Sequence, residues 1–204
     1  MKKSVYLCLS ALVLTVAGLS SCSNEGGGGN GVIWDIAPIE FSVFITDSQG
    51  HDLLDSATQN NLIKDITVVY EGKTYPVENV SDYELRRKGG AKTREYLAHF
   101  KGLLLGKSWS HKTFTSGDYE LRFGEFDGTE SIGLREITLN LPNGIQAKLA
   151  YRNNFGWKPN GNPDRNTQFY LNGQELNDEA GKCGYYNFQY SDTEGLKYVH
   201  SEIK

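Results

Sequence analysis

The sequence predicts an all-β fold, an antiparallel β-sandwich of the immunoglobulin-like or jelly-roll-like kind with few or no helices. Three observations support this prediction. Hydrophobic residues recur at every second position, Gly, Asn, Pro and Asp separate about eight to ten such stretches, and helical periodicity is scarce. The chain has 204 residues, 38% hydrophobic and 23% charged, which suffices for a sizeable core.

The N-terminal residues 1–21 have the pattern of an export signal. Lys2 and Lys3 precede an apolar run from Val5 to Gly18, and small residues follow. This run of about 14 residues is shorter than the roughly 20 that a membrane-spanning helix needs. Removal of residues 1–21 takes away two lysines and no acidic residue, so the net charge falls from −4 to −6. An acidic chain lacks the basic footprint of nucleic-acid binders, and we expect no nucleic-acid partner.

Cys22 ends the run Leu19-Ser20-Ser21-Cys22, which resembles a bacterial lipobox. In a lipobox the cysteine thiol is acylated and its amine becomes the new N-terminus, so the resemblance implies lipid attachment at Cys22, with palmitate among the acyl chains. Buried acyl CH₂ groups contribute about 0.8 kcal/mol each, and several chains together hold a protein on a bilayer. The alternative interpretation is an ordinary signal that is cleaved nearby and leaves Cys22 as a free thiol.

Residues 22–31 follow as the acylated cysteine and a flexible glycine-rich tether. Lipobox, tether and β body together resemble the small lipoproteins of unknown function that are abundant in Bacteroidetes. The resemblance implies a lipid-anchored place at the outer membrane, on its periplasmic or its cell-surface face. In that group an acidic cluster after the cysteine marks export to the outer face, and here Glu25 is the one acidic residue in the tether.

Residues 32–204 are predicted to form a single β-sandwich domain, with two small β-subdomains split near residues 89–93 as the alternative. The clearest strand covers residues 39–46, where Ile39, Phe41, Val43 and Ile45 alternate with a mostly polar set. A hairpin then joins residues 66–70 to residues 74–77, and Pro76, which has no N–H, favours a sheet edge.

Further strands follow toward the C-terminus. Residues 119–123 alternate, and residues 137–141 reach the turn Pro142-Asn143-Gly144 before residues 145–151 return. Residues 167–171 meet Asn172-Gly173, the strongest short hairpin signal, and Tyr186, Phe188 and Tyr190 form one face of a later strand.

Two segments carry weaker helical signals. Tyr96, Phe100, Leu103 and Leu104 have helical spacing, but Gly102 interrupts them and alternation also holds, so a strand is favoured. Residues 56–63 form either a short helix or a polar connection.

Patterns of metal sites and hydrolases are weak or missing. No Gly-x-Ser-x-Gly elbow occurs, and the histidines occur singly, with no metal-ligand spacing, at His51, His99, His111 and His200. Cys183, beside Lys182, is interpreted as a packed residue rather than a nucleophile. We therefore predict no metal site, no cofactor and no catalytic residue.

Two charged clusters in the sequence suggest chemistry or binding. Glu125 and Asp127 are two apart, as on the active-site strands of some sandwich-fold glycosidases, but position 129 is threonine where those families carry a third carboxylate. A glycoside hydrolase is therefore the least favoured function. The basic run Arg86-Arg87-Lys88 is interpreted as a solvated loop tip.

The most suggestive stretch for binding is the predicted long loop at residues 153–166. Trp157 offers an apolar face to sugar C–H groups, and the polar side chains bind hydroxyls or Ca²⁺ through Asn160, Asn162 and Asp164. Tyr185, together with Trp109, is predicted as a further wall residue. The alternative interpretation is that Trp157 plugs the end of the sandwich and the polar residues make turns.

The anchor, the tether, the β body and this stretch predict a lipid-anchored binding or adhesion module of the cell envelope. Its partners would be the membrane, through the N-terminal lipid, and a glycan or protein ligand. The alternative is a structural subunit or assembly factor of a surface fibre, in which an exposed strand edge pairs with a neighbouring chain. An enzyme is not expected.

Overall fold

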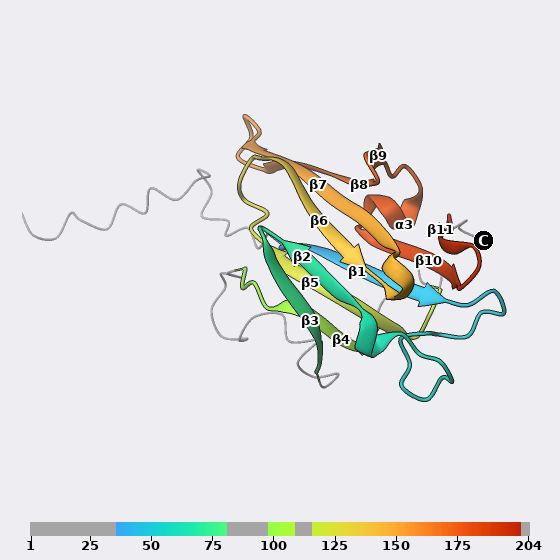
Figure 1. Cartoon of the computed structure of the whole chain (residues 1–204). Helices are drawn as coiled ribbons and strands as arrows, with labels where there is room; N and C mark the ends of the chain where they lie inside the picture. The colour runs from blue at the N-terminus through green and yellow to red at the C-terminus, as the bar shows by residue number, and fades with distance from the viewer. Residues whose placement is uncertain (1–35, 81–97, 109–115, 201–204) are drawn as a thin grey trace, which may run out of the picture. The chain divides into compact units, whose positions relative to one another are not determined.

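The computed structural model describes residues 36–80, 98–108 and 116–200. These residues form an eleven-stranded sheet with the order β11-β10-β1-β5-β4-β3-β2-β6-β7-β8-β9 (Figure 1). The all-β prediction is therefore confirmed. The strands are β1 (Ile39–Thr46), β2 (Thr67–Tyr70), β3 (Lys73–Asn79), β4 (Gly102–Lys107), β5 (Tyr119–Phe126), β6 (Ile132–Asn140), β7 (Gln146–Trp157), β8 (Pro163–Leu171), β9 (Gln174–Glu175), β10 (Tyr185–Ser191) and β11 (Gly195–Tyr198).

Helical structure in the described residues is short. It consists of the 3₁₀ turns η1 (Ile63–Asp65) and η2 (Pro142–Gly144) and the four-residue helix α3 (Glu179–Lys182). The helix considered for residues 56–63 does not form, because turns fill that stretch up to η1.

The sheet is mixed rather than purely antiparallel. β1 runs parallel to β10, and β3 runs parallel to β4, whereas the other neighbours are antiparallel. Both parallel pairs join segments without a tight turn between them, since parallel neighbours need a longer crossover connection. Hairpin signals in the sequence therefore do not predict these two pairs.

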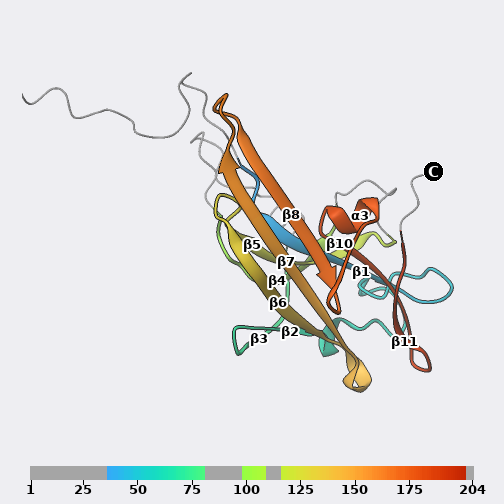
Figure 2. The same ribbon diagram turned by 90° about the horizontal axis from the view of Figure 1, so that it is seen from above.

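Strand β3 joins the two halves of the sheet. Lys73–Pro76 pair with β2, and Val77–Asn79 pair with β4. Pro76 stands at this changeover, where its missing N–H removes no bond to β4. The sheet curls here, and the view in Figure 2 shows the long β7–β8 pair lying across the half that contains β1 and β5.

The hydrophobic core lies between the two halves. Phe41 of β1 is fully buried, and its ring lies 5.7 Å from that of Tyr151 in β7 and 6.0 Å from that of Phe169 in β8. Phe126 and Tyr186 also contact the Phe41 ring, at 6.1 and 5.8 Å. Such aromatic pairs contribute about 0.5–1.5 kcal/mol each beyond the area they bury, so Phe41 ties both halves together.

The predicted strands match the structure closely. The stretch at residues 39–46 is β1, and the three predicted turns join β2 to β3, β6 to β7 and β8 to β9. The polar set of β1 is buried too, at Ser42 and Thr46. The long loop predicted at residues 153–166 is wrong, because these residues extend β7 and β8 into one hairpin with a short turn at its tip.

Several sequence predictions lie outside the described residues. They are the export signal at residues 1–21, Cys22 and the tether up to residue 31, the basic run at residues 86–88, the seam at residues 89–93, and Trp109.

Candidate functional site

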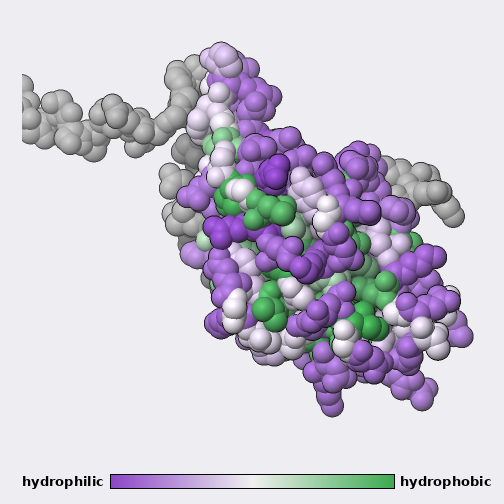
Figure 3. Space-filling model, turned by 45° about the horizontal axis from the view of Figure 1, so that its top comes forward, coloured by the Kyte–Doolittle hydropathy of each residue, from purple (hydrophilic) through white to green (hydrophobic). Residues whose placement is uncertain are grey.

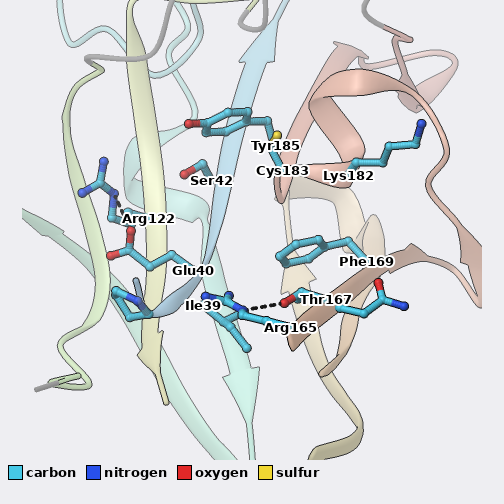
Figure 4. Close-up of a pocket in the computed structure, with 12 residues that line it drawn as sticks. Ile39, Glu40, Ser42, Arg122, Arg165, Thr167, Phe169, Lys182, Cys183 and Tyr185 are labelled. Carbon is cyan, nitrogen blue, oxygen red and sulfur yellow. Dashed lines mark hydrogen bonds and ion pairs between the residues drawn. The ribbon is translucent and has the colours of Figure 1, made fainter. Parts of the chain in front are cut away.

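A pocket of about 540 Å³ opens between β1, β5, β8 and the α3–β10 junction (Figure 4). Three cationic side chains, Arg122, Arg165 and Lys182, line it together with the carboxylate Glu40. The rest of the wall combines polar and apolar groups, namely Pro38, Ile39, Ser42, Asn166, Thr167, Phe169, Cys183 and Tyr185. The described residues of the pocket therefore offer charge, hydroxyl groups and aromatic rings within one concave surface.

Strand register places one row of these side chains. Ser42 of β1 pairs with Arg122 of β5 on one side and with Tyr185 of β10 on the other. Paired residues on neighbouring strands share a face, so these three side chains lie on the same side of the sheet. The opposite side of β1 carries Phe41 and Val43 and faces the core.

The turn after α3 closes the pocket on its other side. Asp178 caps this helix, and its side chain accepts a hydrogen bond from the Gly181 N–H at 3.4 Å. Gly184 has a φ of 81°, and a Cβ there would lie 2.8 Å from both the Glu40 carbonyl oxygen and the Phe169 ring. Glycine is therefore required for the close approach that brings Lys182 and Cys183 to the pocket.

The guanidinium of Arg122 lies between two carboxylates. Its Nη2 donates to Glu120 Oε1 at 2.6 Å, and its Nε lies 3.8 Å from Glu40 Oε2. Burial disfavours the charged form, but Glu120 and Glu40 outweigh it and raise the pKa of Arg122. Glu120 is fully buried, and its Oε2 accepts no hydrogen bond within the described part of the chain.

Arg165 is held differently. Its Nε donates to Thr167 Oγ1 at 2.9 Å, and its Nη1 donates to the Ala37 carbonyl oxygen. No carboxylate of residues 36–80, 98–108 or 116–200 forms an ion pair with it. Burial lowers the pKa of Arg165, because the desolvated charge has no compensating carboxylate.

Of the predicted binding residues, Tyr185 lies in the pocket, and the other four lie at the tip of the β7–β8 hairpin. Trp157 pairs with Pro163, whereas Asp164 pairs with Gly156, so Trp157 and Asp164 project from opposite faces of the hairpin. The structure therefore does not bring the predicted set together around one ligand.

Each residue of the tip has its own environment. Trp157 is 49% exposed with its ring 5.5 Å from that of Phe155, so the interpretation of Trp157 as a plug is wrong. Asn160 Oδ1 accepts the N–H of Asn162 at 3.1 Å, which is a turn interaction. Asp164 is exposed and lies 3.7 Å from Lys158 Nζ.

The face in Figure 3 shows apolar side chains gathered in small groups among polar ones. The large exposed hydrophobic residues of the described part are Phe100, Leu134, Trp157 and Val199. Trp157 is thus the one tryptophan in this part that presents an open aromatic face.

The remaining candidates from the sequence occupy separate places. Glu125 is buried and accepts hydrogen bonds from Lys101 Nζ and the His99 N–H, both at 3.0 Å. Asp127 instead accepts the Thr129 N–H at 2.7 Å in a turn. Cys183 is exposed, which contradicts its interpretation as packed.

Within the described residues there is neither a cluster of metal ligands nor a membrane-spanning helix. No three His, Cys, Asp or Glu side chains lie close enough together there to hold a metal ion. No helix within them has the length and apolar character that crossing a membrane requires.

Sequence reasoning missed Glu40, Arg122 and Arg165. One signal for Arg122 was present, because Glu120 and Arg122 alternate with Leu121 and Phe123 and so share the polar side of a predicted strand. Arg165 lay inside the stretch that was singled out, but as a loop its residues had no predictable facing.

Comparison of the chain with protein-family models, with curated proteins and with solved structures gave no match.

Proposed function

We propose that this chain is a lipid-anchored binding module of the cell envelope and that its ligand binds in the pocket between β1, β5, β8 and the α3–β10 junction. The observation that carries the proposal is the pocket itself. Its volume of about 540 Å³ lies within the roughly 300–1,000 Å³ of small-molecule sites, and convergent polar groups line it.

A glycan is the ligand that fits this lining best. Sugars present apolar C–H faces, which pack on aromatic rings, and hydroxyl groups, which pair with polar side chains. Phe169 and Tyr185 supply rings, and Ser42 and Glu40 supply hydroxyl and carboxylate oxygens. A protein ligand is the alternative, and it would need a larger surface than this pocket.

Binding is tested with the full-length protein in detergent on a broad glycan array. Cys183→Trp places a large ring at an exposed position of the pocket wall, so it should abolish binding without disturbing the core. Glu194→Trp, in an exposed turn outside the pocket, is the matched control and should bind like the unaltered protein. Absence of any binding across the array would rule out the glycan proposal.

The anchor rests on the lipobox resemblance around Cys22. Cys22→Ala removes the acylated thiol and should move the protein from the membrane fraction to the soluble fraction. Cys183→Ala, the same change at the other cysteine beyond the signal, should leave the protein on the membrane. Unchanged membrane association of Cys22→Ala would contradict lipid attachment.

A fibre subunit remains a second candidate because one observation favours it. Among the described strands, Pro163–Gln168 of β8 pair with β7 alone, so the other side of this segment is an open strand edge. Open edges accept a strand from a neighbouring chain. Native mass measurement of the full-length protein over a concentration series tests this, since a strict monomer at every concentration would contradict it.

A further inference from the structure

Positively charged side chains outnumber negatively charged ones in the lining of the pocket. Three cationic side chains line it against one carboxylate, in a chain whose net charge is −4. Arg122 is already compensated by Glu120 and Glu40, and Lys182 lies 3.7 Å from Glu179. Arg165 has no such partner within the described residues, so it is the cation whose charge a ligand would compensate.

The geometry of Arg165 fits a planar anion. Thr167 Oγ1 accepts from its Nε (Figure 4), and the Ala37 carbonyl oxygen accepts from its Nη1. These two bonds hold the side chain in one orientation and leave further N–H groups of the fork for a ligand. A pre-oriented guanidinium binds carboxylates through two parallel hydrogen bonds. Because both fixing partners are neutral, they orient the charge without neutralising it.

The surroundings of Arg165 extend beyond the pocket along the hairpin. Arg165 lies opposite Phe155 on β7, and Trp157 lies one step further along the same face, opposite Pro163. Diagonal neighbours of this kind have Cα atoms about 7–8 Å apart, so one ligand can reach both. The exposed ring of Trp157 offers a stacking surface to the next unit of a chain that starts at Arg165.

We propose that the pocket binds an acidic sugar that is a terminal or an internal unit of an oligosaccharide. Arg165 binds the carboxylate of this sugar, and Trp157 stacks on the adjoining sugar unit. This inference rests on the proposed function and specifies its ligand class. Glu40 accepts hydroxyl hydrogen bonds from the same sugar, and the rings of Phe169 and Tyr185 cover its C–H faces.

The test uses the full-length protein in detergent and short oligogalacturonates as the acidic probe. Their methyl esters are the matched neutral probe, because esterification removes the charge and keeps the sugar. Isothermal titration should give tighter binding of the acid than of the ester by about 10-fold to 100-fold, the range expected for hydrogen bonds to a charged group. Equal affinity for acid and ester would overturn the proposal.

Two substitutions at Arg165 and one control substitution assign the preference for the acid to Arg165. Arg165→Met should remove the preference for the acid, whereas Arg152→Met, an exposed arginine that points from the other face of the same hairpin, should keep it. Arg165→Lys keeps the charge without the fork and should lose most of the preference, and it serves if the methionine variant does not fold. Retention of the preference in both Arg165 variants would overturn the assignment.

The outcomes separate this inference from the proposed function. If neutral glycans bind and Cys183→Trp blocks them while Arg165→Met does not, the pocket is a glycan site and the acidic-sugar inference is wrong. If neither the acid nor the ester binds and the glycan array is empty, both fail.

Discussion

The two faces of the β10–β1–β5 strip are both buried, but they differ in chemistry. The inner face, which packs on β7 and β8, carries Phe41, Val43 and Tyr186. The outer face carries Ser42 and the fully buried Glu120, which pairs with Arg122. The inner side of these strands is therefore apolar, whereas the outer side combines buried Phe44 with polar groups and opens into the pocket.

This difference separates stability from function. Burial of apolar groups is favourable at about 25 cal/mol per Å², whereas a buried ion pair often does no better than apolar residues of the same volume. The inner face therefore accounts for the fold. The outer face costs stability where it buries charge, and its charged row leads from Glu120 through Arg122 to the wall of the pocket.

The largest effect on stability is expected at Phe41, on the inner face. Phe41→Ala removes a fully buried ring that contacts both halves of the sheet, and we expect a loss of about 3–5 kcal/mol in the free energy of unfolding. Denaturant titration followed by circular dichroism measures it. A loss below about 1 kcal/mol would mean that the inner face does not hold the halves together.

Two buried tyrosines, Tyr186 on the inner face and Tyr151 in β7, which packs on it, predict an alkaline limit to stability. Burial raises the pKa of Tyr151 from 10.0 to about 12, and burial also raises the pKa of Tyr186 well above its ordinary value. Because the folded-state pKa exceeds the unfolded one, this contribution is complete below pH 10. It is lost as the pH rises from about 10 through 12, by about 2–3 kcal/mol for Tyr151.

Denaturant titrations between neutral pH and pH 12 measure this loss. Tyr151→Phe keeps the ring and removes the ionisable group, so its stability should fall less steeply over the same range. An equal slope for the variant and the unaltered protein would contradict the role of Tyr151.

The outer face is probed at Glu120. Glu120→Gln leaves the shape and removes the charge that compensates Arg122, at an expected cost of about 1–3 kcal/mol in unfolding free energy. The double variant with Arg122→Met removes both charges and should recover part of that loss. A double variant less stable than Glu120→Gln alone would contradict the view that the buried charges cost stability.

The inner face was predictable from sequence, and the pocket was not. Alternation identifies Phe41 and Val43 as one face, and Asn172-Gly173 identifies the turn between β8 and β9, because both signals are local. The pocket instead depends on the parallel pairing of β1 with β10, which brings Ser42 beside Tyr185 across a large part of the chain. No local pattern encodes such a register, so Tyr185 could be named as a wall residue but its neighbours could not.

The hairpin tip shows the same limit. Residue types singled out Trp157 and Asp164 together, but pairing across β7 and β8 sends their side chains to opposite faces. A one-residue difference in register would have reversed this result. Composition therefore located the segment, and only the strand pairing showed which of its residues share a face with Arg165.

The smallest effect on stability is expected at Trp157, and it sharpens the contrast with Phe41. Its side chain is 49% exposed and its ring contacts that of Phe155, so Trp157→Ala should lower the unfolding free energy by about 1 kcal/mol, even though it removes a larger ring than Phe41→Ala does. Its effect on binding should depend on ligand length. Loss of a stacking ring worth about 1 kcal/mol should weaken a trigalacturonate several-fold and leave galacturonic acid alone unchanged. Asp164→Ala, on the opposite face of the same tip, should change neither affinity. Titration of both sugars into the three proteins decides the point, because equal weakening of the short and the long ligand would place Trp157 at the pocket rather than beyond it.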